Sequence, residues 1–123
     1  MVVVAIIGIL LAVIALPSFM RIRTISQKNI CLNNLRQIES AKEQFAVGGG
    51  YTSGWSFESG TEAFSNLVGQ ANGYIKIYPA CPASANANQQ GTLQRSAADY
   101  NVNSIGSMPS CRVVRSGTDA HVL

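Results

Sequence analysis

The stretch Met1–Met20 reads MVVVAIIGILLAVIALPSFM and carries no charged side chain. A helix of this length, at about 1.5 Å per residue, spans a bilayer hydrocarbon core of about 30 Å. A helix that is apolar on every face would need a large protein around it, and this chain has only 123 residues. A secretory signal has basic residues ahead of its apolar run, and none precede this one. We therefore interpret the stretch as a membrane span.

The apolar pattern changes after this stretch, because apolar side chains then recur at spacings of three, four and seven residues. That period is typical of one stripe on an amphipathic helix. No Gly or Pro interrupts residues 18–47, and Gly48–Gly50 ends the run. We expect one helix over about residues 1–47, bent at Pro17. Its second half is expected to cover a small sheet through a stripe of six residues: Ile22, Ile25, Leu32, Leu35, Ile38 and Phe45.

Residues 48–123 predict a small globular part built from short elements. Residues 48–60 read as a loop with aromatic anchors, and Ser59–Glu62 matches a capping box that predicts a helix over about 61–70. Asn72–Gly73 is a turn signal, and residues 83–98 read as a polar loop. Strands are expected at 74–78, 100–105 and 111–115.

The predicted fold class is α+β, in one chain short enough to form a single domain. One long N-terminal helix packs on a small antiparallel sheet of about three strands, with one short extra helix. The expected divisions are the apolar half of the helix at 1–20, its amphipathic half at 21–47, and the globular part at 48–123.

The charge of the chain is +3, and its basic character lies just after the apolar stretch. Residues 1–38 hold four basic side chains and no acidic one, which suits contact with lipid headgroups. We do not expect nucleic-acid binding, because no basic stripe with interleaved aromatic residues follows. Basic residues after a span favour a cytoplasmic C-terminal part, whereas cysteine usage favours an oxidising compartment. A basic leader upstream of Met1 would remove this conflict.

The three cysteines, Cys31, Cys81 and Cys111, allow three single disulfides. We favour Cys81–Cys111, because each of these residues lies beside a proline-containing turn and a strand end. Such a bond suits a small domain in an oxidising compartment. Three reduced thiols are the alternative. Cys31 is expected to be buried as a small apolar residue.

No metal, cofactor or catalytic residue is predicted. A zinc site needs closely spaced ligand pairs, which the cysteines lack, and the single histidine, His121, lies where chains fray. Asp99, Asn101 and Asn103 alternate like calcium ligands but lack the glycine and glutamate that complete such a loop. No nucleophile–histidine spacing and no phosphate-binding loop is present, so we do not expect an enzyme.

The first helix resembles the N-terminal helix of type IV pilins and type II secretion pseudopilins. The resemblance lies in Val2–Leu10 (VVVAIIGIL) followed by Ala15–Phe19 (ALPSF). Asn33–Lys42 (NNLRQIESAK) looks like the helix continuation of a pseudopilin-like subgroup, and 79–82 and 109–111 look like its disulfide-bearing part. The family's leader, glycine cleavage site, phenylalanine and glutamate lie upstream of this span, so we expect Met1 to be an internal residue of the usual helix.

This resemblance implies a structural subunit of a helical extracytoplasmic filament, either a pseudopilus or a long pilus. Its partners would be copies of itself, the prepilin peptidase and the inner-membrane assembly machinery. Before assembly the chain would sit in the lipid bilayer of the inner membrane with its C-terminal part periplasmic. Two alternatives are a single-span periplasmic binding domain that does not polymerise and a secreted disulfide domain. Close helix packing in the filament core would use small residues: Ala5, Gly8, Ala12 and Ala15.

Overall fold

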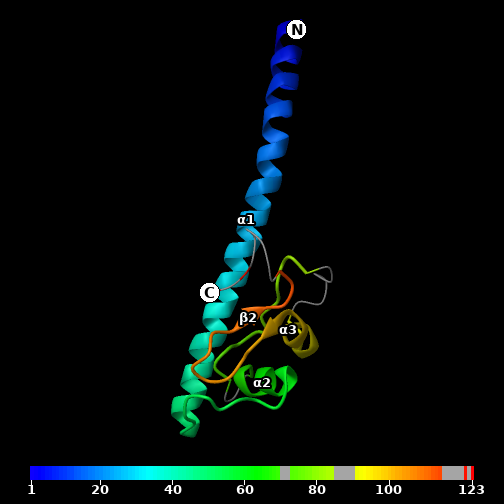
Figure 1. Cartoon of the computed structure of the whole chain (residues 1–123). Coiled ribbons are helices and arrows are strands. Elements are labelled where there is room, and N and C mark those ends of the chain that lie inside the picture. Colours follow the sequence, from blue (N-terminus) through cyan, green and yellow to red (C-terminus); the bar gives the residue numbers. More distant parts are fainter. Residues whose placement is uncertain (70–72, 85–90, 115–120, 122) are drawn as a thin grey trace.

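The computed structural model describes residues 1–69, 73–84, 91–114, 121 and 123, and only the backbone of residues 15–17. The elements in chain order are α1 (Val2–Gly49), α2 (Gly60–Leu67), α3 (Leu93–Asp99), β1 (Tyr100–Asn101) and β2 (Ser110–Cys111). Figure 1 shows α1 as a rod whose first half stands clear of the chain and whose second half is covered by the other elements. The fold is α+β, as the sequence predicts.

Helix α1 is one uninterrupted helix from Val2 to Gly49, which confirms the predicted long helix. It ends at Gly50, whose φ of 70° lies in the left-handed region that glycine adopts without strain. The N–H of Gly50 donates to the carbonyl of Ala46 and closes the last turn. The side chain of Pro17, where we predict a bend, lies outside the described residues.

The stripe on α1 is only partly covered. Leu35 and Ile38 are fully buried, and Leu32 and Phe45 are half-buried against the core. Ile22 and Ile25 are 60% and 50% exposed, so the prediction that they pack on the sheet is wrong. Both residues lie before the segment of α1 that the globular part covers. That segment begins at about Gln27, whose side chain donates to the carbonyl of Pro82 at 3.5 Å.

The sheet is smaller than predicted. Strands β1 and β2 pair antiparallel, with Tyr100 opposite Cys111 and Asn101 opposite Ser110. The chain leaves the sheet after two residues because Asn103 and Gly106 both take positive φ, at 58° and 84°, and turn it away. The predicted strand at 74–78 is absent. Within it only Ile75 forms a bridge, parallel to Val68.

Helix α2 confirms the predicted capping box. The Oγ of Ser59 accepts from the N–H of Glu62 at 3.2 Å, and the Glu62 carboxylate accepts from the N–H of Glu58 at 2.8 Å. Helix α3 corrects the prediction of a loop over 83–98; residues 85–90 of that segment, like the turn at Asn72, lie outside the described residues. Helix α3 packs beside α2 (Figure 1), and its buried face is polar rather than apolar, so no hydrophobic period revealed it.

The aromatic anchors in the loop after α1 pack as predicted. Tyr51 stacks on Phe45 of α1 with ring centroids 5.1 Å apart. Trp55 lies 4.3 Å from Tyr51 and 4.9 Å from Phe57, centroid to centroid. These rings fix the loop to the far end of the helix, where little else covers it.

Candidate functional site

Two features of the molecule could carry function, and the first is the apolar half of α1, residues 1–20. Every side chain from Met1 to Ile14 is exposed, and none of the most apolar window of α1 is buried against the rest of the chain. A buried core helix is therefore excluded for this half. By length and composition it can cross a membrane, which indicates a membrane anchor or a signal sequence.

The small residues of this half lie on one helical face. Ala5, Gly8 and Ala12 are exposed there, and the side chain of Ala15 lies outside the described residues. A Cβ built on Gly8 would meet nothing within 4 Å. The fold of a single chain therefore gives no reason for a glycine at this position.

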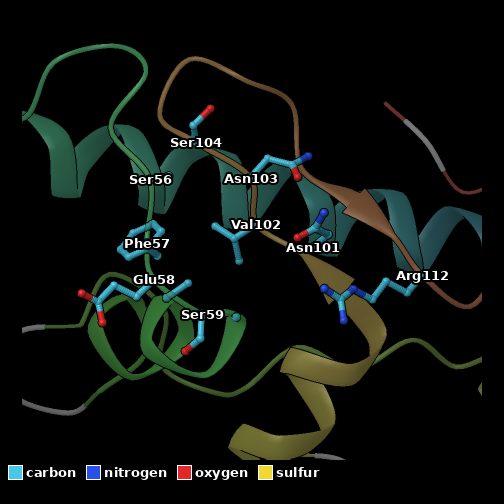
Figure 2. A pocket seen from close by; sticks show the side chains of 11 residues that line it. Ser56, Phe57, Glu58, Ser59, Asn101, Val102, Asn103, Ser104 and Arg112 are labelled. Carbon is cyan, nitrogen blue, oxygen red and sulfur yellow. The ribbon is translucent and has the colours of Figure 1, made fainter.

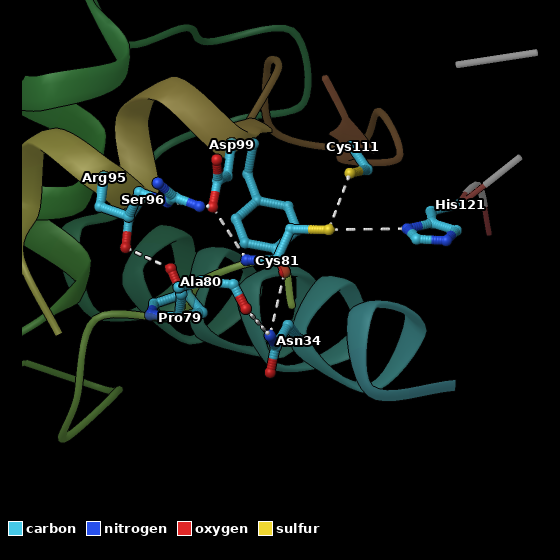
Figure 3. A network of polar contacts seen from close by, with 10 residues as sticks. Asn34, Pro79, Ala80, Cys81, Arg95, Ser96, Asp99, Cys111 and His121 are labelled. Atoms are coloured by element: carbon cyan, nitrogen blue, oxygen red, sulfur yellow. Dashed lines mark hydrogen bonds and ion pairs between the residues drawn. The ribbon is translucent and has the colours of Figure 1, made fainter. Parts of the chain in front are cut away.

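The second feature is a buried cluster of Cys31, Cys81, Cys111 and His121, the cysteine–histidine cluster. Their four ligand atoms all lie within 4.8 Å of one another. The Sγ of Cys81 is 3.8 Å from the Sγ of Cys111 and 3.7 Å from Nδ1 of His121. Figure 3 shows the Cys111 and His121 side chains converging on the Cys81 sulfur. The four residues come from α1, from the segment before α3, from β2 and from the C-terminal segment.

This cluster corrects several predictions. Cys81 and Cys111 are neighbours, but their sulfurs are 3.8 Å apart and all three cysteines are free thiols; a disulfide bond is about 2.05 Å long. Cys31 is fully buried as expected, yet it joins the other two thiols instead of packing as a lone apolar residue. His121 is 2% exposed and not frayed. Its backbone N–H donates to the carbonyl of Val114 at 3.2 Å.

The segment that carries Cys81 is held at three successive residues, as Figure 3 shows. The Ser96 hydroxyl donates to the carbonyl of Pro79. The Asn34 amide donates to the carbonyl of Ala80 at 3.0 Å. The N–H of Cys81 donates to Oδ2 of Asp99 at 2.9 Å. Because α1 and α3 both supply partners, the position of the Cys81 sulfur is fixed from two sides.

The thiols of the cluster differ in acidity. Hydrogen bonds from the Cys31 and Cys81 thiols, with further bonds from the backbone of Val114 and Val113, lower the pKa of Cys111 to about 2. A hydrogen bond to Cys111 raises the pKa of Cys81 to about 11, although the backbone of Ala83 favours its thiolate. Negative charge in the cluster therefore concentrates on the Cys111 sulfur.

The residues considered for calcium do not form a site together. The Asp99 carboxylate accepts from Nε of Arg95 at 2.7 Å and from the backbone of Cys81. The Asn103 amide donates to the carbonyl of Met108 at 2.6 Å. Both side chains are committed to separate partners that stabilise the fold.

A hollow of about 290 Å³ lies between the start of α2 and the chain after β1. Figure 2 shows Glu58 and Arg112 on opposite sides of it. Both of these side chains are exposed, and the wall between them is formed by Phe57, Val102 and small polar residues.

The cysteine–histidine cluster escaped prediction because its successive members stand 10 to 50 residues apart in the sequence. One signal could have found it: three cysteines and one histidine make up the four soft ligands of a closed zinc site. Comparisons with known proteins add no constraint, since no protein-family model, no curated protein and no solved structure matches this chain.

Proposed function

We propose that this chain is a structural subunit of a helical extracytoplasmic filament, of the pseudopilus or type IV pilus kind. In this proposal α1 holds the chain in the inner membrane before assembly, with the C-terminal part in the periplasm. The observation that carries the proposal is the division of a single helix: residues 1–14 are exposed and apolar, while Cys31, Leu35 and Ile38 are buried. The likeness of Val2–Leu10 and Ala15–Phe19 to pilin helices supports it.

The apolar half of α1 has two environments in which it is stable. In lipid its side chains meet acyl chains, and in a filament they meet the same half of other copies. Helices that leave lipid gain little from the hydrophobic effect, so close packing must favour assembly, and small residues permit it. A face of Ala5, Gly8 and Ala12 supplies such residues. A repeated contact between unlike faces that does not close into a ring produces a filament.

The basic residues after the span fit the membrane-held state. Arg21 and Arg23 are exposed on α1 just beyond the apolar half. At that depth their guanidinium groups meet the phosphates of lipid headgroups. The proposed boundary of the bilayer is therefore near Met20, and the globular part stands clear of the membrane because it covers α1 only from about Gln27.

The substitution Gly8→Leu tests the filament proposal. Among the described residues nothing lies within 4 Å of a Cβ built at Gly8, so we expect the fold and the membrane span to be retained. A bulky residue on the small-residue face separates neighbouring helices, and we expect at least a tenfold loss of filaments. The matched control is Leu10→Phe, which adds bulk on the opposite face at 100° per residue.

The readout is the amount of the chain in filaments sheared from cells and seen by electron microscopy, against the amount in membranes. Normal filament yield for Gly8→Leu would contradict tight packing at this face. A second outcome is that the unaltered chain forms no filaments and that chemical cross-linking in the membrane gives only monomer. That outcome would favour the alternative of a single-span periplasmic binding domain that does not polymerise.

A further inference from the structure

The cysteine–histidine cluster has the chemical composition of a metal site and the burial of a structural one. Cys31, Cys81, Cys111 and His121 are each at most 2% exposed. Three sulfurs and an imidazole nitrogen are the ligands that zinc prefers in closed, four-coordinate sites. We propose that these four residues bind one zinc ion that stabilises the globular part.

The distances fit a tetrahedral ion. With Zn–S near 2.3 Å and Zn–N near 2.0 Å, the edges of a tetrahedron are about 3.8 Å between sulfurs and about 3.5 Å between sulfur and nitrogen. The Cys81–Cys111 sulfurs are 3.8 Å apart, and the Cys81 sulfur is 3.7 Å from Nδ1 of His121. All remaining separations among the four ligand atoms are below 4.8 Å. Small side-chain rotations complete the tetrahedron.

The charges of the four side chains also suit a divalent ion. An ion of charge +2 among three thiolates leaves a small net charge, which suits a buried site far better than unpaired thiolates do.

Outer-shell contacts orient the ligands as metal sites require. The Asp99 carboxylate fixes the backbone of Cys81, and Asn34 fixes the residue before it. Pairing with Tyr100 across the sheet fixes Cys111. The cluster thus has a positioned first shell, and four protein ligands leave no open position for a substrate. The site is structural, because it ties α1, β2 and the C-terminal segment together.

A disulfide between Cys81 and Cys111 is the competing state, since the same two sulfurs cannot form that bond and both bind zinc as thiolates. The two states differ in what Cys31 and His121 contribute. Zinc needs both residues, whereas the disulfide needs neither. The variants Cys31→Ser and His121→Gln therefore separate the states without removing Cys81 or Cys111.

The experiment uses the full chain, purified in detergent with zinc in the growth medium. We expect zinc in equimolar amount by mass spectrometry of the metal. Replacement by Co²⁺ should give the intense visible bands of tetrahedral cobalt and the charge-transfer bands of cobalt–thiolate bonds. Cys31→Ser and His121→Gln should lose the bound zinc and the cobalt bands. His121→Cys supplies a fourth sulfur ligand in place of the imidazole and should keep the zinc and the bands. A merely structural role of His121 would not explain that result.

The contrary outcome is a metal-free chain whose Cys81 and Cys111 resist alkylation until reduced. Metal-free chain with three alkylatable thiols and no cobalt bands would also overturn the proposal. Loss of zinc to a chelator should lower the unfolding temperature of the unaltered chain and leave that of His121→Gln unchanged. None of these readouts depends on filament assembly, so the zinc and filament proposals stand or fall separately.

Discussion

Lys42 shows how one residue can depart from the pattern that surrounds it. It lies next to Ala41 on the apolar stripe of α1 and is only 1% exposed. Its ammonium donates to the carbonyls of Val102 and Ser104, each at 3.0 Å, and to that of Ser107. A buried ammonium with three acceptors is satisfied, and it fixes the turn after β1 to the helix.

Replacing Lys42 by Met keeps most of the volume and removes the three donors. One buried carbonyl and two partly buried carbonyls then lose their partner, and we expect the free energy of unfolding to fall by about 2–3 kcal/mol. Urea unfolding followed by the fluorescence of Trp55 measures this. The control is Lys76→Met at an exposed position, where a change within about 0.5 kcal/mol is expected. Equal effects of the two variants would show that the three bonds contribute nothing.

Asp99 is a second residue on which several parts of the structure depend. It pairs with buried Arg95 at 2.7 Å and accepts from the backbone of Cys81. Nη2 of Arg95 has no hydrogen-bond partner among the described residues, so Asp99 supplies the counter-charge that this buried guanidinium needs.

The substitution Asp99→Asn leaves the Arg95 guanidinium buried and uncompensated. We expect a loss of about 3–5 kcal/mol in unfolding free energy, as for other broken buried pairs. Glu43→Gln on the exposed face of α1 is the control and should be nearly neutral. Chemical denaturation of both variants decides the point; a loss below about 1 kcal/mol for Asp99→Asn would place the stabilisation elsewhere.

At the level of single elements, α2 is eight residues long and depends on its cap. Removing the Ser59 hydroxyl by Ser59→Ala leaves the N–H of Glu62 without its acceptor, and we expect a cost of about 1 kcal/mol. Ser56→Ala in the exposed loop before it tests for a general effect of serine loss. Thermal unfolding of the two variants measures the difference. Equal unfolding temperatures for Ser59→Ala and Ser56→Ala would contradict a role for the cap.

The elements differ in how far the sequence predicts them. Helices α1 and α2 follow from local signals, namely an apolar period, a glycine stop and a capping box. The segment 74–78 has strand composition, yet a strand needs a run of paired residues, and Ile75 forms only an isolated bridge, to Val68. Helix α3 was missed because Arg95, Ser96 and Asp99 form its buried face. The cysteine–histidine cluster was missed because its residues meet only through tertiary packing.

At the scale of the whole molecule, the chain is a rod and a small globular part that share one helix (Figure 1). The globular core contains residues of α1 only from Cys31 onward. Residues 1–14 are exposed and add nothing to that core. Stability of the globular part and behaviour of the apolar half are therefore separable properties.

Deletion of residues 1–20 should abolish membrane association and leave the globular part folded. We expect the shortened chain to remain soluble without detergent. Its free energy of unfolding in urea should equal that of the full chain in detergent within about 0.5 kcal/mol. Flotation on a density gradient and urea unfolding measure the two effects. Collapse of the fold on deletion would show that the apolar half stabilises the globular part after all.

The meeting of Cys31 with His121 also sets an order of events when the chain is made. Ribosomes add about 5–20 residues per second, so Cys31 emerges several seconds before His121. Cys111 emerges ten residues before His121, so all three thiols are present without their imidazole partner for only about 0.5–2 s. On the zinc proposal, slower synthesis of the last segment lengthens this interval and shifts newborn chains toward the oxidised form.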